Sequence, residues 1–208
     1  TWKCLGLEAT KTIHRIVINP KNSNQLWVAA MGSVWGGNAE RGVYRSDDGG
    51  STWKQVLFVN LNTGCAELVI DPLNPQKLYA AMWDYERKPW TFRSGGPGSG
   101  LYISLDGGNT WNRASDKTGL PKGELGRIGL AVAASRPDRV YALVESAETA
   151  VYRSDDGGLH WQKISTEANA GNRPFYYSEI YVDPSNENRV YSNWSQITRS
   201  EDGGKHWD

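Results

Sequence analysis

The sequence predicts an all-β fold, a β-propeller of four-stranded antiparallel blades, with about four blades present in the 208 residues. Three observations support this prediction. A short box recurs four times, a second β-rich element recurs between the boxes, and no segment has the apolar spacing of an amphipathic helix. A four-stranded unit that repeats every ~40–50 residues is typical of a propeller blade.

The recurring box reads S-x-D-G-G-x-[TH]-W and occupies residues 46–53, 104–111, 154–161 and 200–207, which we number boxes 1 to 4. Its paired glycines tolerate the positive φ of a tight turn, and its aspartate can accept backbone N–H bonds across that turn. The adjacent acids lack the ligand spacing of calcium loops. We therefore predict a structural role for Ser46, Asp48, Trp53, Ser104, Asp106, Trp111, Ser154, Asp156, Trp161, Ser200, Asp202 and Trp207.

The second repeated element is a short aliphatic run, followed by an aromatic residue seven positions after its last residue. The runs end at Pro20, Pro72, Ala134 and Pro184, and the aromatic residues are Trp27, Tyr79, Tyr141 and Tyr191. In the first copy this pattern predicts strands at about 13–19, 25–31, 42–46 and 52–57. The chain then divides into blades at about 3–58, 59–115, 116–165 and 166–208, with one more strand at 1–3.

Composition excludes several classes of function. Lysine plus arginine and aspartate plus glutamate number 23 each, so the chain lacks the positive charge that favours nucleic acid or an anionic membrane. No uncharged apolar run approaches the ~18 residues of a membrane-spanning helix, and no signal peptide is visible at Thr1. Cys4 and Cys65 lack metal-ligand spacing and no cofactor fingerprint is present, so we expect neither metal nor cofactor.

The four boxes resemble the BNR or Asp-box repeat, and the resemblance covers the whole chain. Residues 71–79 (DPLNPQKLY) and 42–50 (GVYRSDDGG) look most similar to the sortilin-type and xyloglucanase-type branch of these propellers. Residues 88–100 and 173–177 resemble a bacterial group of large exported proteins described as sortilin-like or glycosyl-hydrolase-like. The resemblance implies an extracellular, periplasmic or cell-surface location.

Propellers of this kind usually have more than four blades, and Thr1-Trp2 reads as the tail of a further box. We favour a set of consecutive blades from a larger ring, which pairs with the rest of a parent propeller or with a second copy. An open array of blades exposes an edge, so it needs such a partner. In the alternative, residues 1–3 complete the last blade beside Trp207 and close a small ring.

A binding site is expected on the propeller face where loop lengths vary. The longest connection, 84–99, combines aromatic rings with guanidinium groups, which suit a carbohydrate, a peptide or a carboxylate. In the alternative, Trp90 and Phe92 fold back onto the blade. The predicted ligand-binding residues are Trp90, Phe92, Arg87, Arg93, Trp35, Arg41, Arg15, Arg173 and Tyr176.

Arg15, Glu67 and Glu179 hold one register position, five residues before the end of an aliphatic run. Their neighbours along each strand are aliphatic, so strand alternation places the three charged side chains on the opposite side. We predict that they lie at the channel mouth, with Arg15 and Glu67 on neighbouring blades. Their role is either a structural ion pair or the polarisation of a ligand.

Two functions from different classes remain open. The first is a non-catalytic module that binds a peptide, a protein or a glycan. The second is a glycoside hydrolase, which generally needs two carboxylates about 5–9.5 Å apart. The weak catalytic candidates are Glu67, Glu179 and Tyr177. The Arg-Ile-Pro motif of sialidases and a convincing xyloglucanase acid pair are absent from the sequence, so we favour the binding module.

Overall fold

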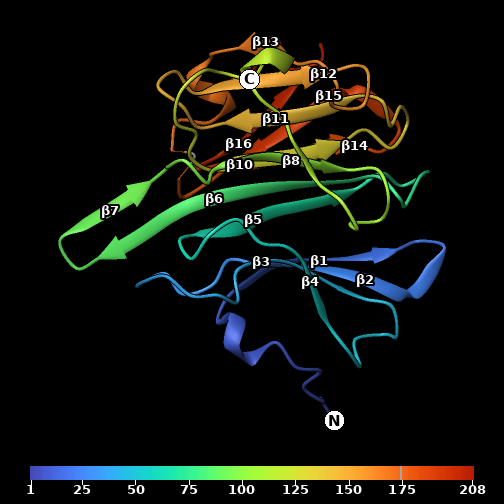
Figure 1. The fold of residues 1–208 in the computed structure, drawn as a ribbon. Helices are drawn as coiled ribbons and strands as arrows, with labels where there is room; N and C mark the ends of the chain where they lie inside the picture. Colours follow the sequence, from blue (N-terminus) through green and yellow to red (C-terminus); the bar gives the residue numbers. More distant parts are fainter. Residues whose placement is uncertain (174) are drawn as a thin grey trace.

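The computed structural model describes residues 1–173 and 175–208 and has the all-β architecture of a propeller. Four antiparallel sheets lie side by side as blades (Figure 1). Three short 3-10 helices lie in the connections: η1 (Glu8–Thr10), η2 (Asp116–Thr118) and η3 (Ala168–Ala170). No helix in the described part of the chain is long and apolar enough to cross a bilayer.

Each blade is a meander whose strands follow one another in chain order from the centre outward, except that β7 of blade 2 pairs only with β6 and lies off this path. Blade 1 contains β1 (Ile13–Asn19), β2 (Asn22–Ala30), β3 (Gly42–Ser46) and β4 (Lys54–Leu57). Blade 2 contains β5 (Thr63–Ile70), β6 (Leu78–Lys88), β7 (Thr91–Ser94), β8 (Gly100–Ser104) and β9 (Asn112–Arg113). Blade 3 contains β10 (Ile128–Val132), β11 (Val140–Val144), β12 (Ala150–Ser154) and β13 (Gln162–Ser165). Blade 4 contains β14 (Glu179–Asp183), β15 (Asn186–Asn193) and β16 (Ile197–Ser200).

Two expectations are corrected by these strands. Residues 1–3 form no strand and Trp2 is fully exposed, so the N-terminus does not complete blade 4. The connection 84–99 is not a simple loop, because β6 continues to Lys88 and pairs with β7 in the register Lys88↔Thr91. The two-residue turn between them makes a hairpin that projects from the molecule (Figure 1).

Apolar clusters fill the contacts between successive blades. Between blades 1 and 2, the buried side chains of Trp27 and Val43 belong to one cluster with Leu68 and Leu78. Equivalent clusters join blade 2 to blade 3 and blade 3 to blade 4. Full burial of one aliphatic side chain contributes about 1.5–3 kcal/mol. A smaller cluster at one end of the blades brings Met31 and Val34 of blade 1 together with Trp83 of blade 2 and with Phe175, which precedes β14.

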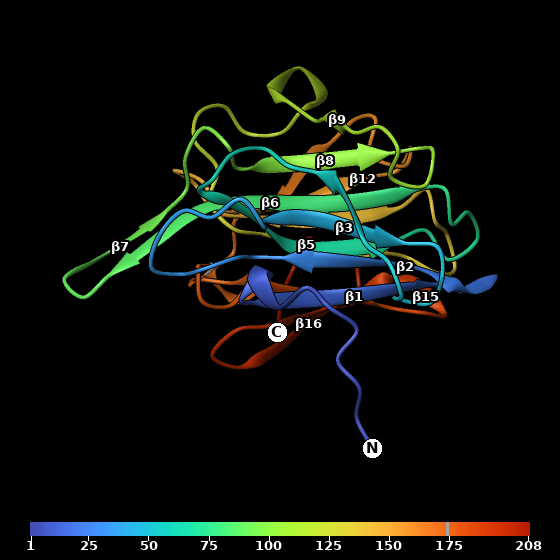
Figure 2. The same ribbon diagram turned by 60° about the horizontal axis from the view of Figure 1, so that its bottom comes forward.

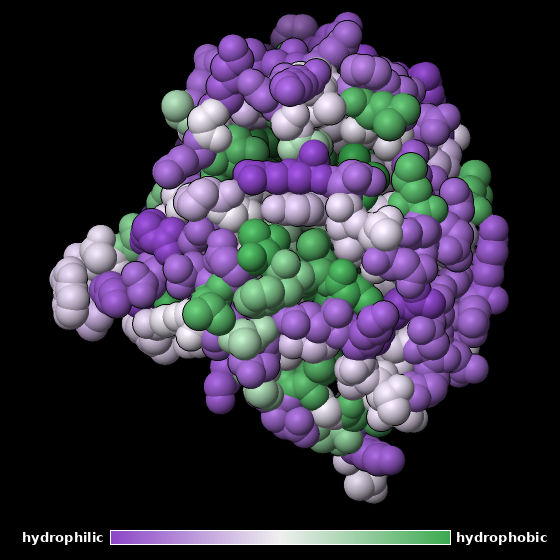
Figure 3. Space-filling view, viewed as in Figure 1, coloured by the Kyte–Doolittle hydropathy of each residue, from purple (hydrophilic) through white to green (hydrophobic). Residues whose placement is uncertain are grey.

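The inner strands β1, β5, β10 and β14 surround a central channel. A cavity of about 410 Å³ lies between them, with aliphatic walls that include Val17, Leu68, Leu130 and Ile180. Figure 3 shows apolar side chains gathered over the middle of the stacked strands, with polar side chains around them. Because each wall side chain comes from a different blade, the packing of the blades sets the width of the channel.

Each box folds as a turn held by its own serine and aspartate. In box 1 the Gly50 N–H donates to Ser46 Oγ at 2.8 Å, and the Ser46 hydroxyl donates to Asp48 at 2.8 Å. Asp48 accepts the Thr52 hydroxyl at 2.7 Å and the Thr52 N–H at 2.9 Å, and these bonds lower the pKa of Asp48 to about 2. Gly49 and Gly50 have φ of 72° and 91°, where side chains are strained. Boxes 2 to 4 repeat these bonds.

A second type of hydrogen bond joins successive blades. The Trp27 indole N–H donates to the Gly107 carbonyl of box 2 at 3.0 Å, and the Tyr79 hydroxyl donates to the Gly157 carbonyl of box 3 at 3.0 Å. The Tyr141 hydroxyl donates to a backbone carbonyl of blade 4 at 2.7 Å. The aromatic residue of the second repeated element therefore connects its own blade to the next one, which the sequence pattern alone did not indicate.

The substitution Tyr79→Phe tests this connection. It leaves the buried Gly157 carbonyl without a donor, so we expect the free energy of unfolding to fall by about 1–2 kcal/mol. Urea unfolding followed by circular dichroism measures the change. Tyr102→Phe is the matched control in the same blade, because no hydrogen bond to the Tyr102 hydroxyl is found among the described residues. An equal loss of unfolding free energy in both variants would show that the hydrogen bond from Tyr79 to the Gly157 carbonyl does not stabilise the contact between the blades.

In box 4 a histidine takes the place of threonine, and His206 Nδ1 lies 2.6 Å from Asp202. This hydrogen bond raises the pKa of His206 above 6.5. The protonated ring therefore stabilises the fold fully below the unfolded pKa, and this contribution is lost as the pH rises through the folded pKa. We expect His206→Thr to reduce the difference in unfolding free energy between about pH 5.5 and pH 8.5. An NMR titration midpoint at or below 6.5 for His206 would contradict this.

Candidate functional site

Three loops from different blades meet on one face, which we call the loop face. They are residues 31–41 of blade 1, the β6–β7 hairpin of blade 2 and residues 175–178 before β14. The Arg87 N–H donates to the Val34 carbonyl at 2.8 Å, and the Arg87 guanidinium donates to the Tyr176 hydroxyl at 3.1 Å. Figure 2 shows the hairpin extending beyond the stacked strands. The loops predicted to bind a ligand therefore lie together.

Arg15 on β1 is held between two carboxylates at the mouth of the channel. Its Nε donates to Glu67 Oε1 at 2.8 Å and its Nη2 donates to Glu67 Oε2 at 3.1 Å, which makes a bidentate pair. Nη2 also donates to Glu179 Oε2 on β14. The three side chains meet as the strand register predicts, and the ligand-polarising role stays a prediction.

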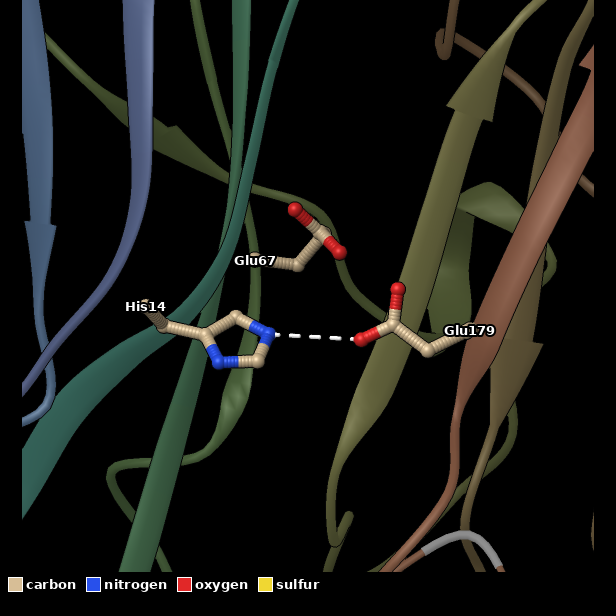
Figure 4. Close-up of side chains that lie close together, drawn as sticks. All are labelled: His14, Glu67 and Glu179. Carbon is tan, nitrogen blue, oxygen red and sulfur yellow. Dashed lines mark ion pairs between the residues drawn. The ribbon is translucent and has the colours of Figure 1, made fainter. Parts of the chain in front are cut away.

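Glu179 is held as an anion by its neighbours. The ring nitrogen His14 Nε2 lies 3.5 Å from Glu179 Oε1 (Figure 4). The Tyr181 hydroxyl donates to Glu179 Oε2 at 2.6 Å. A hydrogen bond from His14, the bond from Tyr181 and the charge of Arg15 outweigh burial and lower the pKa of Glu179 to about 2. This carboxyl group therefore has no proton to donate near neutral pH, as a general acid must.

Arg127, just before β10, adds blade 3 to this cluster. Its Nη1 donates to the Tyr176 carbonyl at 2.9 Å, and its Nη2 lies 3.3 Å from His14 Nε2. Its guanidinium lies over the Trp83 ring, 5.6 Å from the centroid, and burial lowers its pKa. Because arginine only donates hydrogen bonds, His14 Nε2 accepts from Arg127 in the tautomer that has no hydrogen on Nε2, and it can donate to Glu179 when Nε2 carries the hydrogen.

The side chains of His14, Glu67 and Glu179 place three potential metal ligands within 4.8 Å of one another (Figure 4). Imidazole nitrogen and carboxylate oxygen are ordinary zinc ligands. However, the guanidinium of Arg15 already binds both carboxylates, so a cation between them would have to displace it. The residues fit an ion-pair network better than a metal centre.

An aromatic cluster joins the hairpin to the loop of blade 4. Trp83 stacks on Tyr85 with 4.4 Å between ring centroids, and Phe92 lies parallel to Tyr176 at 6.1 Å. Phe175 packs against both Phe92 and Tyr176. Phe92 therefore folds back onto the molecule, as one of the two alternatives for this loop predicted.

Other predicted ligand-binding residues are open to solvent. Trp90 is 80% exposed at the tip of the hairpin, Trp35 is 63% exposed and Tyr176 is 41% exposed. The Arg173 guanidinium lies 5.1 Å from the centroid of the Tyr176 ring. The loop face thus offers aromatic rings with cations beside them, as the sequence predicts.

Two predicted arginines have structural contacts instead. Arg41 is completely buried and donates to three backbone carbonyls of the surrounding loops, so the expectation that it binds a ligand is wrong for this conformation. Arg93 pairs with the buried Asp84 carboxylate at 2.5 Å and donates to the Gly95 carbonyl at 2.9 Å. The sequence shows that both residues are charged, but it does not show which carbonyl and carboxylate oxygens accept their hydrogen bonds in the folded chain.

The predicted site residues did not include three members of the cluster: His14, Tyr181 and Arg127. The tyrosine that contacts Glu179 is Tyr181, whereas the catalytic candidate Tyr177 is 43% exposed and packs beside Tyr176. Tyr181 lies two residues after Glu179 on β14, so strand alternation could have identified it. Arg127 has no such signal, because it lies before the regular part of its strand.

The comparisons with known proteins show the fold. No protein-family model and no curated protein matches the sequence. Among solved structures, a GH74 xyloglucanase from Xanthomonas campestris matches with a TM-score of 0.70 and 18% identity, over 93% of this chain and 28% of that one. YCF48 from Cyanidioschyzon merolae matches at 0.61 and 18%, over 100% of this chain and 58% of that one. A structure titled YCF48 bound to D1 peptide matches at 0.56 and 17%, over 95% and 52%.

The substitution Glu179→Gln tests the ion-pair network. The pKa of about 2, lowered from 4.5, means that the carboxylate stabilises the fold fully above about pH 4.5, and that this contribution is lost as the pH falls toward 2. We expect a loss of about 2 kcal/mol in unfolding free energy near pH 7, which shrinks toward pH 2.5. Urea unfolding across this pH range measures it.

Glu148→Gln is the matched control, because Glu148 forms an exposed ion pair with Lys163. Such a pair contributes about 0–1 kcal/mol. An equal loss of unfolding free energy in both variants would show that the pair of Arg15 and Glu179 stabilises the fold no more than an exposed ion pair does.

Proposed function

We propose that the chain is a non-catalytic recognition module whose loop face binds a protein or a peptide. The observation that carries this proposal is the channel mouth, where Arg15 pairs with both Glu67 and Glu179. Two carboxylates that bind the same guanidinium are suited to holding the inner strands in place and are less suited to transferring protons. The exposed rings and guanidinium groups beside them supply the contact surface.

The loop face has the chemistry of a protein-binding surface. Tryptophan, tyrosine and arginine contribute most of the energy at protein interfaces. Tyr176 is held by the Arg87 side chain through its hydroxyl, and Arg173 lies over its ring. A surface held in place before binding loses little entropy when a ligand arrives. The two arginines favour a peptide that carries a carboxylate.

The peptide-bound YCF48 structure is consistent with this role, because it is a structural neighbour with a peptide ligand. This support is an analogy, since one fold hosts many functions. The motif resemblance further leads us to propose an exported protein, located outside the cell, in the periplasm or on the cell surface. Detection only in a cytosolic fraction would refute that location.

The second candidate is a glycoside hydrolase, favoured by the xyloglucanase fold similarity and by the proximity of Glu67 and Glu179. Glycosidases of this type need one carboxylic acid with a raised pKa. Here the pKa of Glu179 is lowered to about 2. The arrangement therefore argues against catalysis by this pair.

A peptide-display experiment tests the binding role. Peptides that the wild-type chain enriches from a phage-displayed library are measured against purified variants by biolayer interferometry. We expect Trp90→Ala and Arg173→Ala each to weaken binding about tenfold or more, because they remove exposed contacts. Leu105→Ala is the control, since Leu105 is exposed in box 2, away from the loop face. No enriched peptide, or equal binding by all variants, counts against the proposal.

A hydrolysis assay separates the two candidates. We expect no release of reducing sugar from xyloglucan or mixed-linkage β-glucan, because Glu179 cannot supply a proton to the leaving group. Release of sugar that Glu67→Gln and Glu179→Gln abolish, while the variants stay folded, would replace the binding role with the enzymatic one.

A further inference from the structure

An arginine connects a blade to the following box at two of the three blade junctions. It directly precedes the box serine in the sequence. Arg45 donates to the Gly107 carbonyl of box 2 at 3.0 Å, and Arg153 donates to the Gly203 carbonyl of box 4 at 3.2 Å. Blade 2 has Ile103 at this position, so the junction of blades 2 and 3 is built without the arginine.

The residue that follows the box serine differs at the same junction. Asp47 in box 1 accepts a hydrogen bond from Gln25 at 2.9 Å, and Asp155 in box 3 accepts one from Arg139 at 2.6 Å. Each donor lies two residues before the aromatic residue that contacts the next blade. Box 2 has Leu105 in place of the acid, so this polar pair is missing from blade 2.

Lys77 is the counterpart of these donors in blade 2, because it lies two residues before Tyr79. Since box 2 carries Leu105, the acid that the other blades supply at this place is absent. Among the residues that the structure describes, the lysine ion pairs involve Lys88 and Lys163 and not Lys77. Lys77 therefore carries a positive charge without the carboxylate partner that its position has elsewhere in the repeat.

A cavity of about 340 Å³, which we call the box groove, lies at this junction. Ile103, Leu105 and Leu159 line it, and Leu105 and Leu159 are 60% and 61% exposed. Leu159 in box 3 holds the position of Asn109 in box 2 and Lys205 in box 4. All three aliphatic residues therefore stand where the neighbouring junctions have polar ones. The volume lies at the small end of the range of about 300–1,000 Å³ that is usual for ligand pockets.

The charges around the box groove favour an anionic group. Lys77 and Arg113 line the groove, and Arg113 donates to the Ser99 carbonyl at 2.6 Å rather than to a carboxylate. The acid in the lining is Asp156, which already binds the His160 N–H at 2.9 Å and the His160 ring at 2.7 Å within its own box. An apolar wall thus has an unneutralised cation beside it, which is complementary to a ligand that carries a negative charge.

The junction of blades 2 and 3 is held together by contacts other than the exposed leucines. Tyr79 donates to the Gly157 carbonyl at 3.0 Å, and a buried cluster that includes Trp161 joins the two blades. Leu105 and Leu159 lie outside this cluster. A single exposed apolar side chain needs no explanation, whereas two from neighbouring blades that line one cavity indicate a contact surface.

We propose that the box groove binds a segment of a partner protein that presents a large apolar side chain next to a carboxylate. The apolar side chain packs against Ile103, Leu105 and Leu159. The carboxylate binds Lys77 and so takes the place of the acid that boxes 1 and 3 carry. Adjacent residues of a polypeptide present these two groups close together, which suits a small apolar cavity with a cation beside it. This site is separate from the loop face and goes beyond the proposed function.

An NMR titration of the ¹⁵N-labelled chain tests this proposal. The probe is a capped pentapeptide with leucine at its centre and glutamate on both sides. We expect saturable shifts of the Gly157 and Leu159 amide signals. A matched peptide with glutamine in place of both glutamates should bind about threefold more weakly, because it lacks the charge that pairs with Lys77. A matched peptide with serine in place of leucine should bind about tenfold more weakly, because it buries little apolar surface.

Substitutions that copy residues of the neighbouring junctions test the same site in chains that are expected to fold. Leu105→Asp introduces the residue of box 3 and gives Lys77 its acid, and Leu159→Asn introduces the residue of box 2. Each should weaken binding of the leucine peptide about tenfold, because it removes part of the apolar wall. Lys77→Gln introduces the residue of blade 1 and should remove the preference for glutamate over glutamine. Leu73→Ser is the matched control, because Leu73 is 65% exposed and does not line the groove.

Circular dichroism checks that every variant is folded. Weaker binding by the two leucine substitutions in the groove but not by Leu73→Ser, together with loss of the glutamate preference in Lys77→Gln, supports the proposal. The absence of a saturable shift at Gly157, or a shift that these substitutions leave unchanged, overturns it. Equal binding of the glutamate and glutamine peptides by the wild-type chain also overturns it. Shifts confined to loop-face signals such as that of Tyr176 overturn it as well, and they leave the proposed function unaffected.

Discussion

The contacts between successive blades depend on the direction of one glycine carbonyl in each of boxes 2 to 4. The serine and aspartate close the turn with their own side chains, and the positive φ of the glycines follows from that closure. In boxes 2 and 3 the first glycine carbonyl then accepts an aromatic donor from the preceding blade. The same short sequence therefore shapes its own hairpin and positions the neighbouring blade. Local turn chemistry and tertiary packing are coupled through that carbonyl.

Blade packing in turn makes the channel mouth possible. Burying a charged side chain is costly unless it is paired, and Arg15 can pair with Glu67 only because blades 1 and 2 are held in register. Arg127 connects this network to the loop face through the carbonyl of Tyr176. The exposed aromatic surface is thus connected to a network of partly buried ion pairs. Such support is what a recognition surface needs in order to bind without large rearrangement.

The sequence was most informative where a pattern repeats. Recurrence of the boxes predicts the blades, and alternation along each inner strand predicts that Arg15 and Glu67 meet, because both signals are local and periodic. Contacts between distant segments leave no such signal. Nothing near Arg41 in the sequence shows that three carbonyls enclose its guanidinium, and nothing near Arg127 shows that it reaches His14. Those contacts exist only once the blades are assembled.

Repetition also allows equivalent positions in different blades to be compared. In a repeat protein each unit buries its apolar face against a neighbour, so equivalent positions should have equivalent burial. Ile180 at the contact of blades 3 and 4 follows this rule, and Ile16 does not. Leu5 offers one apolar side chain and one carbonyl where a whole blade offers a sheet. The exposure of Ile16 against the burial of Ile180 therefore measures how much of the apolar contact at each internal interface comes from the preceding sheet.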